Sequence, residues 1–483
     1  MRTTLISGAR RSALVALVAT GLLAGCGDFD VIDPNNPTID DLVKNPTKSK
    51  LAVAATGLFI GARSDAVDVI WRYGSNGREG ANLAGNNQPD YQEPFFGPLS
   101  TTQFGSAVWS GRYQNIRSIN TYQNAVPRAL DLTAEERAAS IGFARTLKAL
   151  AFMPLIAGRG ALGAPVDVDQ PLSAAPAPFV TEDSVYGFII GELDAARDSL
   201  AAGGAAFPFH MPPGFSGFDT PATLILVNRA LAAKAWVFRA TATPACAATC
   251  YANALTALSQ SFVTSNAADF KVGAYFDYSN KPGDILNELS ETLDGTTYFA
   301  FNNTVDDAQL QPGGAVDQRA LDKLAFIDPN DTTVTYTLSG FPVNPNRKFA
   351  VFFTGGQPDQ NAPIPIIRDE ELVLLRAEAN IGLSNFAAAI PDLDLVRVNA
   401  GGLAPTTLTA ASPTSAFVDE LLYNRRYSLL WEQGARWVDA RRYGRLATIP
   451  VLVPNGAVPS RMPIPADECA ARKLGTSCNP LGT

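Results

Sequence analysis

Residues 424–443, NRRYSLLWEQGARWVDARRY, combine apolar residues at helical spacing with charged residues on the same faces. The spacing predicts a helix, a break at Gly434 and a second helix, because glycine readily takes the left-handed conformation that ends a helix. The charged residues among these apolar positions are Arg425, Glu432, Arg436 and Asp439. An unpaired charge in a low-dielectric interior is strongly destabilising. We therefore expect a buried network of ion pairs here, in preference to an acid and a base that act on a substrate.

This stretch resembles the C-terminal signature of the SusD/RagB family of nutrient-binding outer-membrane lipoproteins. In that signature an Arg-Arg pair leads through Leu-Leu-x-Glu-x-Gly to Arg-Trp-x-Asp and a further Arg, and the match covers residues 425–442. Asn424 and Ser428 stand where the family often has acids. This departure predicts that part of the ion network is lost or rewired.

Further segments carry the same resemblance: LLRAEAN at 374–380, the run at 392–401 with Asp394 and Asn399 replacing expected residues, and Met-Pro-Ile-Pro at 462–465 followed by Glu468 and Asn-Pro at 479–480. The resemblance implies a mainly α fold, with a scaffold of tetratricopeptide-like helix pairs and a loop-rich region containing a few short strands. It also implies a binding protein that caps a SusC-like, TonB-dependent outer-membrane barrel and captures an oligosaccharide or a peptide.

The N-terminus has the features of a bacterial lipoprotein signal. Its first eleven residues include three arginines, residues 13–23 form an apolar core too short to cross a bilayer, and Leu-Ala-Gly-Cys at 23–26 forms a lipobox. We expect residues 1–25 to be removed and Cys26 to carry the lipid anchor. Gly27, and not an aspartate, follows it, which favours the outer membrane, with the protein facing the cell exterior.

The polar residues after Cys26, interrupted by Pro34 and Pro37, predict a lipidated tether over 26–37. Residues 38–483 then form a single SusD-like domain. Without the signal peptide the chain has 35 basic and 46 acidic residues, a net charge of −11. This charge argues against nucleic-acid binding.

Four cysteines remain besides Cys26, and they fall into two local pairs, Cys246 with Cys250 and Cys469 with Cys478. An envelope location favours disulfides. Zinc is the alternative, but the spacing does not suit paired zinc ligands and the chain has one histidine. Each disulfide would close a short loop and stabilise one corner of the fold.

Motifs of catalysis are missing from the sequence. His210, in a loop rich in proline and phenylalanine, is the only histidine available for a Ser-His pair or a metal site, and a packed or solvent-facing ring is the commoner outcome. Neither a Gly-x-Ser-x-Gly elbow nor a His-Glu-x-x-His helix occurs. We expect no catalytic residues, no metal and no cofactor.

Apolar periodicity predicts helices over 40–62, 106–125, 133–152, 181–200, 221–240, 251–262, 369–382 and 385–399. Thr38, Thr133 and Thr181 are placed to cap the first, third and fourth of them. The aromatic residues of 106–125 are expected in the core. The pairs at 221–262 and 369–399 resemble the tetratricopeptide-like hairpins of the SusD/RagB family.

The region 270–367 differs from these helical blocks, because it is rich in Gly, Asn, Asp and Pro. Strands are predicted at 298–301, 334–338 and 348–354. We interpret the region as an insertion packed on the scaffold, with a separate domain as the alternative. Loops held by a rigid scaffold commonly carry binding surfaces.

Sugars bind by stacking on aromatic rings while their hydroxyls bond to amide and charged side chains, so a loop that combines these residues is a candidate sugar site. The predicted ligand-binding residues are Trp71, Tyr73, Arg78, Asn86, Asp90 and Tyr91 in one stretch and Tyr275 and Tyr278 in another. Trp71, Tyr73 and Tyr91 rank first, and Tyr91 is expected to be exposed. The alternative is that these aromatic residues only anchor long loops.

Two other functions remain open at this point. A surface glycosidase that uses two carboxylates needs no histidine, and acids are abundant. A purely structural helical-repeat lipoprotein would need no small ligand. Neither has a positive signal in the sequence, and the loop aromatics count mildly against the structural role.

Overall fold

The computed structural model describes residues 39–171 and 173–483, and of residues 39–41 the backbone alone. The predicted signal peptide, Cys26, the tether and the predicted cap Thr38 lie outside the described residues. The helices are α2 (Ile39–Lys44), α3 (Lys48–Arg63), α4 (Ala66–Asn76), α5 (Gln88–Phe96), α6 (Ser110–Ala125), α7 (Ala134–Arg159), α8 (Glu182–Ala201), α9 (Pro221–Ala242), α10 (Ala247–Ser259), α11 (Asn303–Asp306), α12 (Gln318–Lys323), α13 (Asp369–Gly382), α14 (Phe386–Asn399), α15 (Thr414–Ser428), α16 (Ala435–Arg442) and α17 (Ala466–Ala471).

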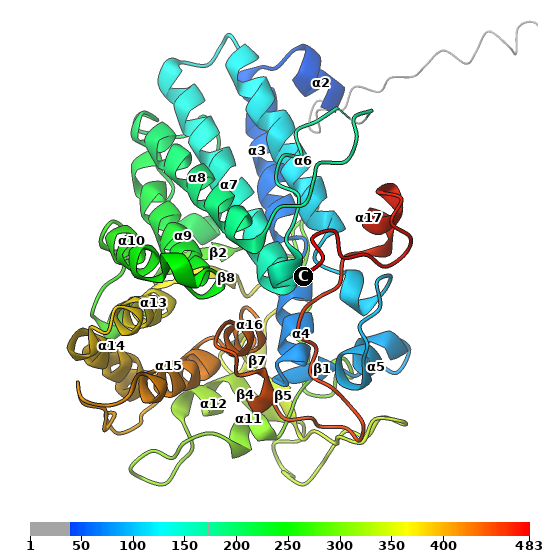
Figure 1. Cartoon of the computed structure of the whole chain (residues 1–483), viewed down its shortest axis with the longest axis vertical. Coiled ribbons are helices and arrows are strands. Elements are labelled where there is room, and N and C mark those ends of the chain that lie inside the picture. Colours follow the sequence, from blue (N-terminus) through cyan, green and yellow to red (C-terminus); the bar gives the residue numbers. More distant parts are fainter. Residues whose placement is uncertain (1–38, 172) are drawn as a thin grey trace, which may run out of the picture.

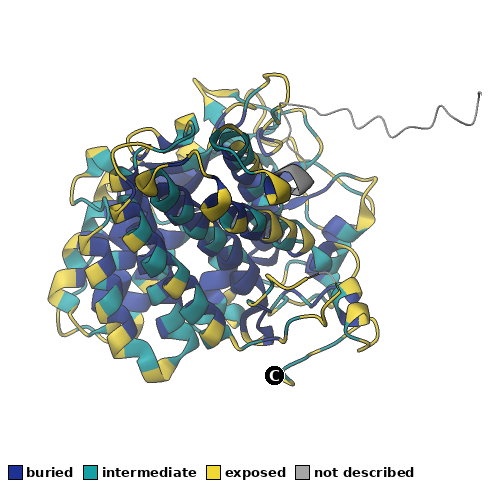
Figure 2. Cartoon of the chain, turned by 90° about the horizontal axis from the view of Figure 1, so that it is seen from above, coloured by how far each residue is buried: buried dark blue, intermediate teal, exposed yellow. Residues whose placement is uncertain are grey.

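The long helices form an array in which chain neighbours lie side by side (Figure 1). Helix α3 packs on α6, and each helix from α6 to α10 packs on the next; α10 then contacts α13, which packs on both α14 and α15. Buried residues line the inward helix faces and exposed residues the outward faces (Figure 2). The predicted mainly α scaffold of helix pairs is confirmed.

Helix α7 lies in the middle of this array and carries much of the core. The hydroxyl of Thr133 accepts a hydrogen bond from the backbone N–H of Glu136, and the carboxylate of Glu136 accepts one from the backbone N–H of Thr133. This is the capping box that the Thr-x-x-Glu pattern predicts. Residues 134–162 are long and apolar enough to cross a membrane, but most of their central stretch is buried against α6, α8 and α9. Among the described residues this is the only such segment, and its burial identifies it as a core helix.

Most predicted helix positions agree with the structure to within a few residues, but the first prediction is wrong. The predicted helix 40–62 is two helices, α2 and α3, separated by Asn45-Pro46. Proline cannot donate a backbone hydrogen bond inside a helix, so the chain breaks there, and Thr47 starts α3 by accepting the N–H of Lys50.

Short antiparallel strands join the loop-rich region to the scaffold. They are β1 (Gly80–Asn82), β2 (Gly273–Phe276), β3 (Tyr298–Ala300), β4 (Leu324–Phe326), β5 (Arg347–Phe349), β6 (Phe353–Thr354), β7 (Gln357–Pro358) and β8 (Ile364–Arg368). One sheet has the order β1-β3-β5-β4, and β2 pairs with β8. The strand predicted at 334–338 does not form; that segment packs as an irregular loop against the sheet, with Tyr336 stacked on Phe299.

Both predicted disulfides are present. Cys246 joins Cys250 at the start of α10, and Cys469 in α17 joins Cys478. Their Cα atoms are 5.5 Å and 5.6 Å apart, which is usual for this bond. With partners 4 and 9 residues apart, each bond stabilises only a local turn.

The signature stretch forms the predicted helix, break and helix, with one correction. Helix α15 already ends at Ser428, so Gly434 does not end it; Gly434 is the residue that starts α16. Its φ is +60°, and a Cβ atom there would lie 2.3 Å from Cβ of Tyr73. Only glycine therefore fits between this turn and α4.

The expected ion network is buried at the junction of α13, α15 and α16. Nε of Arg425 lies 2.7 Å from Asp439, and Arg442 contacts both Asp439 (2.7 Å) and Glu378 (2.8 Å). Burial acts to raise the pKa of Asp439, but Arg425 and Arg442 together outweigh burial and hold it below its usual value. The charges here are structural, as the sequence predicted.

The network is rewired at the two positions that depart from the family pattern. Arg319 donates to Oδ1 of Asn424 and to Oγ of Ser428, both at 3.0 Å. Its carboxylate partner is Asp317, two residues earlier in the chain, at 2.6 Å. Asn424 and Ser428 thus bind an arginine whose charge is compensated by an acid outside the signature stretch.

A buried carboxyl beside this network makes stability depend on pH. One oxygen of Glu79 accepts the N–H of Trp431 at 3.4 Å, and the other has no partner among the described residues. Burial, opposed by Arg436, raises the pKa of Glu79 from 4.5 to about 7.

Because the folded pKa of Glu79 is raised, its contribution to stability is fully present below pH 4.5 and is lost as the pH rises through 7. We expect up to about 3 kcal/mol of the free energy of unfolding to disappear between pH 5 and 8 for this reason. Glu79→Gln should flatten that slope. Urea unfolding of both proteins across this range checks it, and equal slopes would contradict the assignment.

Candidate functional site

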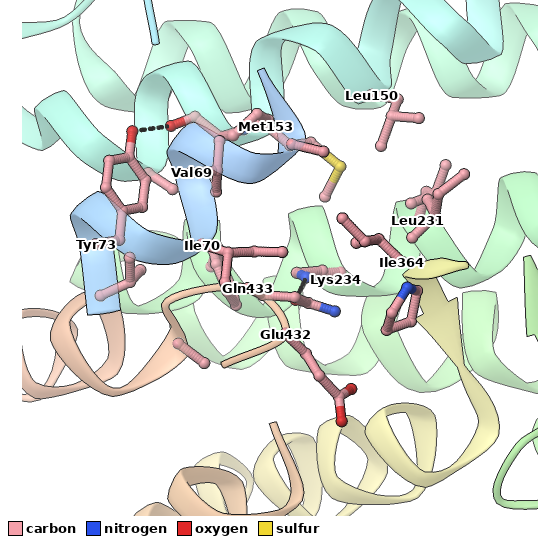
Figure 3. A pocket seen from close by; sticks show the side chains of 18 of the residues that line it. Val69, Ile70, Tyr73, Leu150, Met153, Leu231, Lys234, Ile364, Glu432 and Gln433 are labelled. Atoms are coloured by element: carbon pink, nitrogen blue, oxygen red, sulfur yellow. Dashed lines mark hydrogen bonds between the residues drawn. The ribbon is translucent and has the colours of Figure 1, made fainter. Parts of the chain in front are cut away.

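The cavity between α4, α7, α9 and β8 is apolar over most of its wall (Figure 3). Tyr73 closes one side, its hydroxyl donating to the carbonyl of Pro154 at 2.9 Å. Lys234 lies at another side, paired with Glu371 at 2.8 Å. The cavity measures about 110 Å³, whereas sites for drug-sized ligands measure roughly 300–1,000 Å³. It is too small for an oligosaccharide and is better described as a packing gap in the scaffold.

A larger polar cleft opens where the segment 280–298 meets the residues after β7. It measures about 710 Å³ and is lined by Asn280, Leu286, Glu288, Ser290, Glu291, Thr292, Thr297, Tyr298, Pro358, Asp359, Gln360 and Asn361. Most of these side chains carry hydroxyl, amide or carboxylate groups. Their density suits a ligand with many hydroxyls.

Hydrogen bonds fix one wall of the cleft around Glu291. Its carboxylate accepts the backbone N–H groups of Thr297 (2.9 Å) and Tyr298 (3.0 Å) and pairs with Lys348. Burial acts to raise the pKa of Glu291, but Lys348 and these bonds outweigh it and lower that pKa. Glu291 therefore serves as an anchor for the start of β3.

The opposite wall is tied to the same segment. The N–H of Asp359 donates to Oγ of Ser290 at 2.8 Å, and the N–H of Asn287 donates to the carbonyl of Gln360 at 2.8 Å. Asn361 accepts the N–H of Asn280 through Oδ1 at 3.1 Å. The two walls thus hold each other in place, while the side chain of Gln360 stays exposed.

Tyr298 lies at the floor of the cleft. Its ring packs near Trp71 and Trp431, with centroids 6.3 Å and 6.1 Å away, and the residue is 7% exposed. Its hydroxyl bonds to no described residue. Burial is the main cause that raises the pKa of this phenol, and nearby acids, first Glu288, raise it further. The hydroxyl therefore remains a hydrogen-bond donor at neutral pH.

Three of the predicted ligand residues are buried in α4 and the turn after it. Trp71 packs edge-on against Phe104, Tyr73 closes the internal cavity, and Arg78 donates to the carbonyls of Ser75 and Ala457. Their side chains leave no ring face or charge on the surface, since each is at most 4% exposed. Replacing any of them would affect folding before it affected a ligand.

The other predicted residues of this stretch lie at the start of α5. Tyr91 is buried and packs edge-on against Phe341, so the expectation that it is exposed is wrong. Asp90 is also buried, and its carboxylate accepts hydrogen bonds from the side-chain amides of Asn82 (2.9 Å) and Asn87 (2.6 Å). Of the six residues predicted there, Asn86 alone is exposed.

The second predicted pair, Tyr275 and Tyr278, precedes the cleft-lining Asn280 in the chain. Tyr275 is half-buried in β2, and its hydroxyl donates to the carbonyl of Lys271. Tyr278 is buried under Arg63, whose guanidinium lies 5.3 Å from the ring centroid. Trp71 thus supports the cleft through its contact with Tyr298, and none of Trp71, Tyr275 and Tyr278 lines the cleft.

Sequence reasoning missed the residues that do line the cleft, Tyr298, Gln360 and Asn361 above all. Tyr298 was included only as the first residue of a strand. A local signal did exist for the other two, because Gly-Gln-Pro-Asp-Gln-Asn at 356–361 is a polar turn rich in amides.

Two of the acids of the cleft, Glu291 and Asp359, are poorly suited to act as the general acid of two-carboxylate catalysis. A general acid must stay protonated near neutral pH, which requires a raised pKa. Lys348 lowers the pKa of Glu291, and the backbone of Asn361 with the hydroxyl of Thr354 lowers that of Asp359. In the described part of the chain no group of three or more metal-ligating side chains occurs either. The lining of the cleft fits a site that binds a polar ligand.

Comparison with known proteins points to one family. Residues 325–473 match the model of the SusD family, and no curated protein matches the chain. Among solved structures, a SusD superfamily protein from Bacteroides vulgatus is 15% identical, with a TM-score of 0.66 over 88% of this chain and 97% of that one.

Two further solved structures have the same fold. The surface glycan-binding protein A from Bacteroides thetaiotaomicron, in complex with laminarihexaose, is 14% identical, with a TM-score of 0.64 over 89% of this chain and 98% of that one. NanU from B. fragilis is 16% identical, with a TM-score of 0.62 over 92% of this chain and 99% of that one. At such identities the likeness concerns the fold.

Proposed function

Because this chain belongs to the SusD family, as its signature stretch predicted, we propose that it is a nutrient-binding protein that captures oligosaccharides in the polar cleft. The observation that carries the proposal is the cleft itself, whose volume of about 710 Å³ and hydroxyl-rich, amide-rich lining suit a sugar chain. The structural relative bound to laminarihexaose supports an oligosaccharide in preference to a peptide.

The proposal extends to the cell envelope. The lipobox ending at Cys26 supports a lipid anchor in the outer membrane with the domain facing outward. Membership of the family supports delivery to a SusC-like, TonB-dependent barrel. In this role the protein binds its ligand without turnover and uses no cofactor.

A binding screen of neutral oligosaccharides against the soluble domain, residues 38–483, tests the proposal. We expect at least one oligosaccharide to bind and to be recovered unchanged. Gln360→Ala should weaken that binding about fivefold, since one hydrogen bond contributes about 1 kcal/mol. Gln360 is exposed and its side chain bonds to no described residue, so the change should leave folding intact.

Gln114→Ala provides the matched control, because Gln114 is exposed on α6 and lines no part of the cleft. Its affinity should equal that of the wild type. Failure of every oligosaccharide to bind, or release of shorter sugars during the assay, would refute capture without turnover.

A further inference from the structure

The lining of the polar cleft contains acids and no bases. Glu288, Glu291 and Asp359 line it, and neither lysine nor arginine does. Two of the three acids are already engaged, Glu291 by Lys348 and Asp359 by Thr354 and Asn361. Their charges are therefore partly compensated by the protein.

Glu288 is different, because nothing in the described chain engages it. It is exposed at the mouth of the cleft, and its carboxylate accepts no hydrogen bond and forms no ion pair with any described residue. A free carboxylate in this position is available to a ligand. It also repels a ligand of like charge.

Tyr298 gives an independent indication that a ligand completes this site. It is more than nine-tenths buried, it lines the cleft, and its hydroxyl has no partner among the described residues. The ring is buried, but the hydroxyl itself keeps contact with solvent, so it can donate a hydrogen bond to a ligand that enters the cleft. The charged groups that act on this hydroxyl are Glu288, Asp68, Asp90 and Glu291, all acids.

We infer that the cleft selects its sugars by charge. It accepts neutral oligosaccharides, binds those with a protonated amine more tightly through Glu288, and disfavours those with carboxylates. The inference rests on the proposed function and names the substrate class of the same cleft. An exposed ion pair changes affinity about two- to fivefold, and a repulsive contact has a similar effect of opposite sign.

Three tetrasaccharides with one β-1,4 backbone test this inference: those of glucose, glucosamine and glucuronic acid. Their affinities for residues 38–483 are measured by NMR titration up to millimolar concentration, at low and high salt. We expect the glucosamine chain to bind about two- to fivefold tighter than the glucose chain, and the glucuronic acid chain to bind most weakly. The differences should shrink in high salt, because screening weakens exposed charge pairs.

Glu288→Gln should remove the advantage of the amine. The control is Glu135→Gln, which removes the same charge from the first turn of α7, away from the cleft, and should keep that advantage. The inference is overturned if the acidic chain binds tightest, if Glu288→Gln keeps the preference, or if none of the three chains binds. When other neutral oligosaccharides still bind in the wider screen, that last result overturns the inference alone and leaves capture standing.

Discussion

Arg425→Ala is expected to lower the free energy of unfolding by about 3 to 5 kcal/mol. Arg425 is 1% exposed, and it contacts both oxygens of Asp439, at 2.7 Å and 3.3 Å. Without it, Asp439 and Glu378 remain buried with Arg442 as their shared cation. Two buried carboxylates would then depend on one guanidinium. Chemical unfolding followed by circular dichroism measures the loss.

Arg436→Ala is the matched comparison on the same helix. Arg436 lies 3.9 Å from Asp307 and 3.3 Å from the carbonyl of Arg78, so its contacts are longer and fewer. Burial, reinforced by Arg426, lowers the pKa of its guanidinium to about 9, which indicates incomplete compensation of the charge. We expect Arg436→Ala to lower the free energy of unfolding by less than about 2 kcal/mol. Equal losses in the two variants would contradict a network centred on Arg425. Neither residue lines the cleft, so oligosaccharide affinity of the folded protein should not change.

Cys26→Ala is expected to release the protein from the membrane completely. Each buried methylene of an acyl chain contributes about 0.8 kcal/mol, so the anchor supplies nearly all of the attachment if the described domain only rests on the surface. The measurement is fractionation of cells that express the full chain, together with the mass of the mature N-terminus. The wild type should carry lipid on residue 26 and sediment with membranes.

Cys246→Ala serves as the control for cysteine loss, because it breaks a disulfide within the domain and leaves the lipobox intact. This variant should stay in the membrane fraction. A Cys26→Ala protein that remains there after a high-salt wash would show that another part of the chain makes the attachment.

Features encoded by nearby residues could be predicted from the sequence. Helix α13 agrees with its prediction at both ends, and the caps at Thr133 and Thr181 are where the local pattern places them. The ion network was predictable too, since charges on an apolar helix face need partners. The break at Pro46 could also have been predicted, because proline disfavours a helix interior; the prediction of one helix over 40–62 followed apolar periodicity alone.

The cleft could not be predicted because residues distant in the chain build it. Glu288 and Tyr298 meet Gln360 and Asn361 only after β2 pairs with β8 and β3 joins the larger sheet. The aromatic residues of α4 were misleading for a related reason. Burying large rings is strongly stabilising, so Trp71 and Tyr73 pack into the core, and their sequence does not distinguish this from display on a surface.

A crystal structure of residues 38–483 with an oligosaccharide that binds in the screen would show whether the polar cleft is the binding site. We predict a sugar chain between Glu288 and Gln360, with a hydroxyl within hydrogen-bonding distance of Tyr298. A well-ordered oligosaccharide on another face, with the cleft empty, would refute oligosaccharide capture in the cleft.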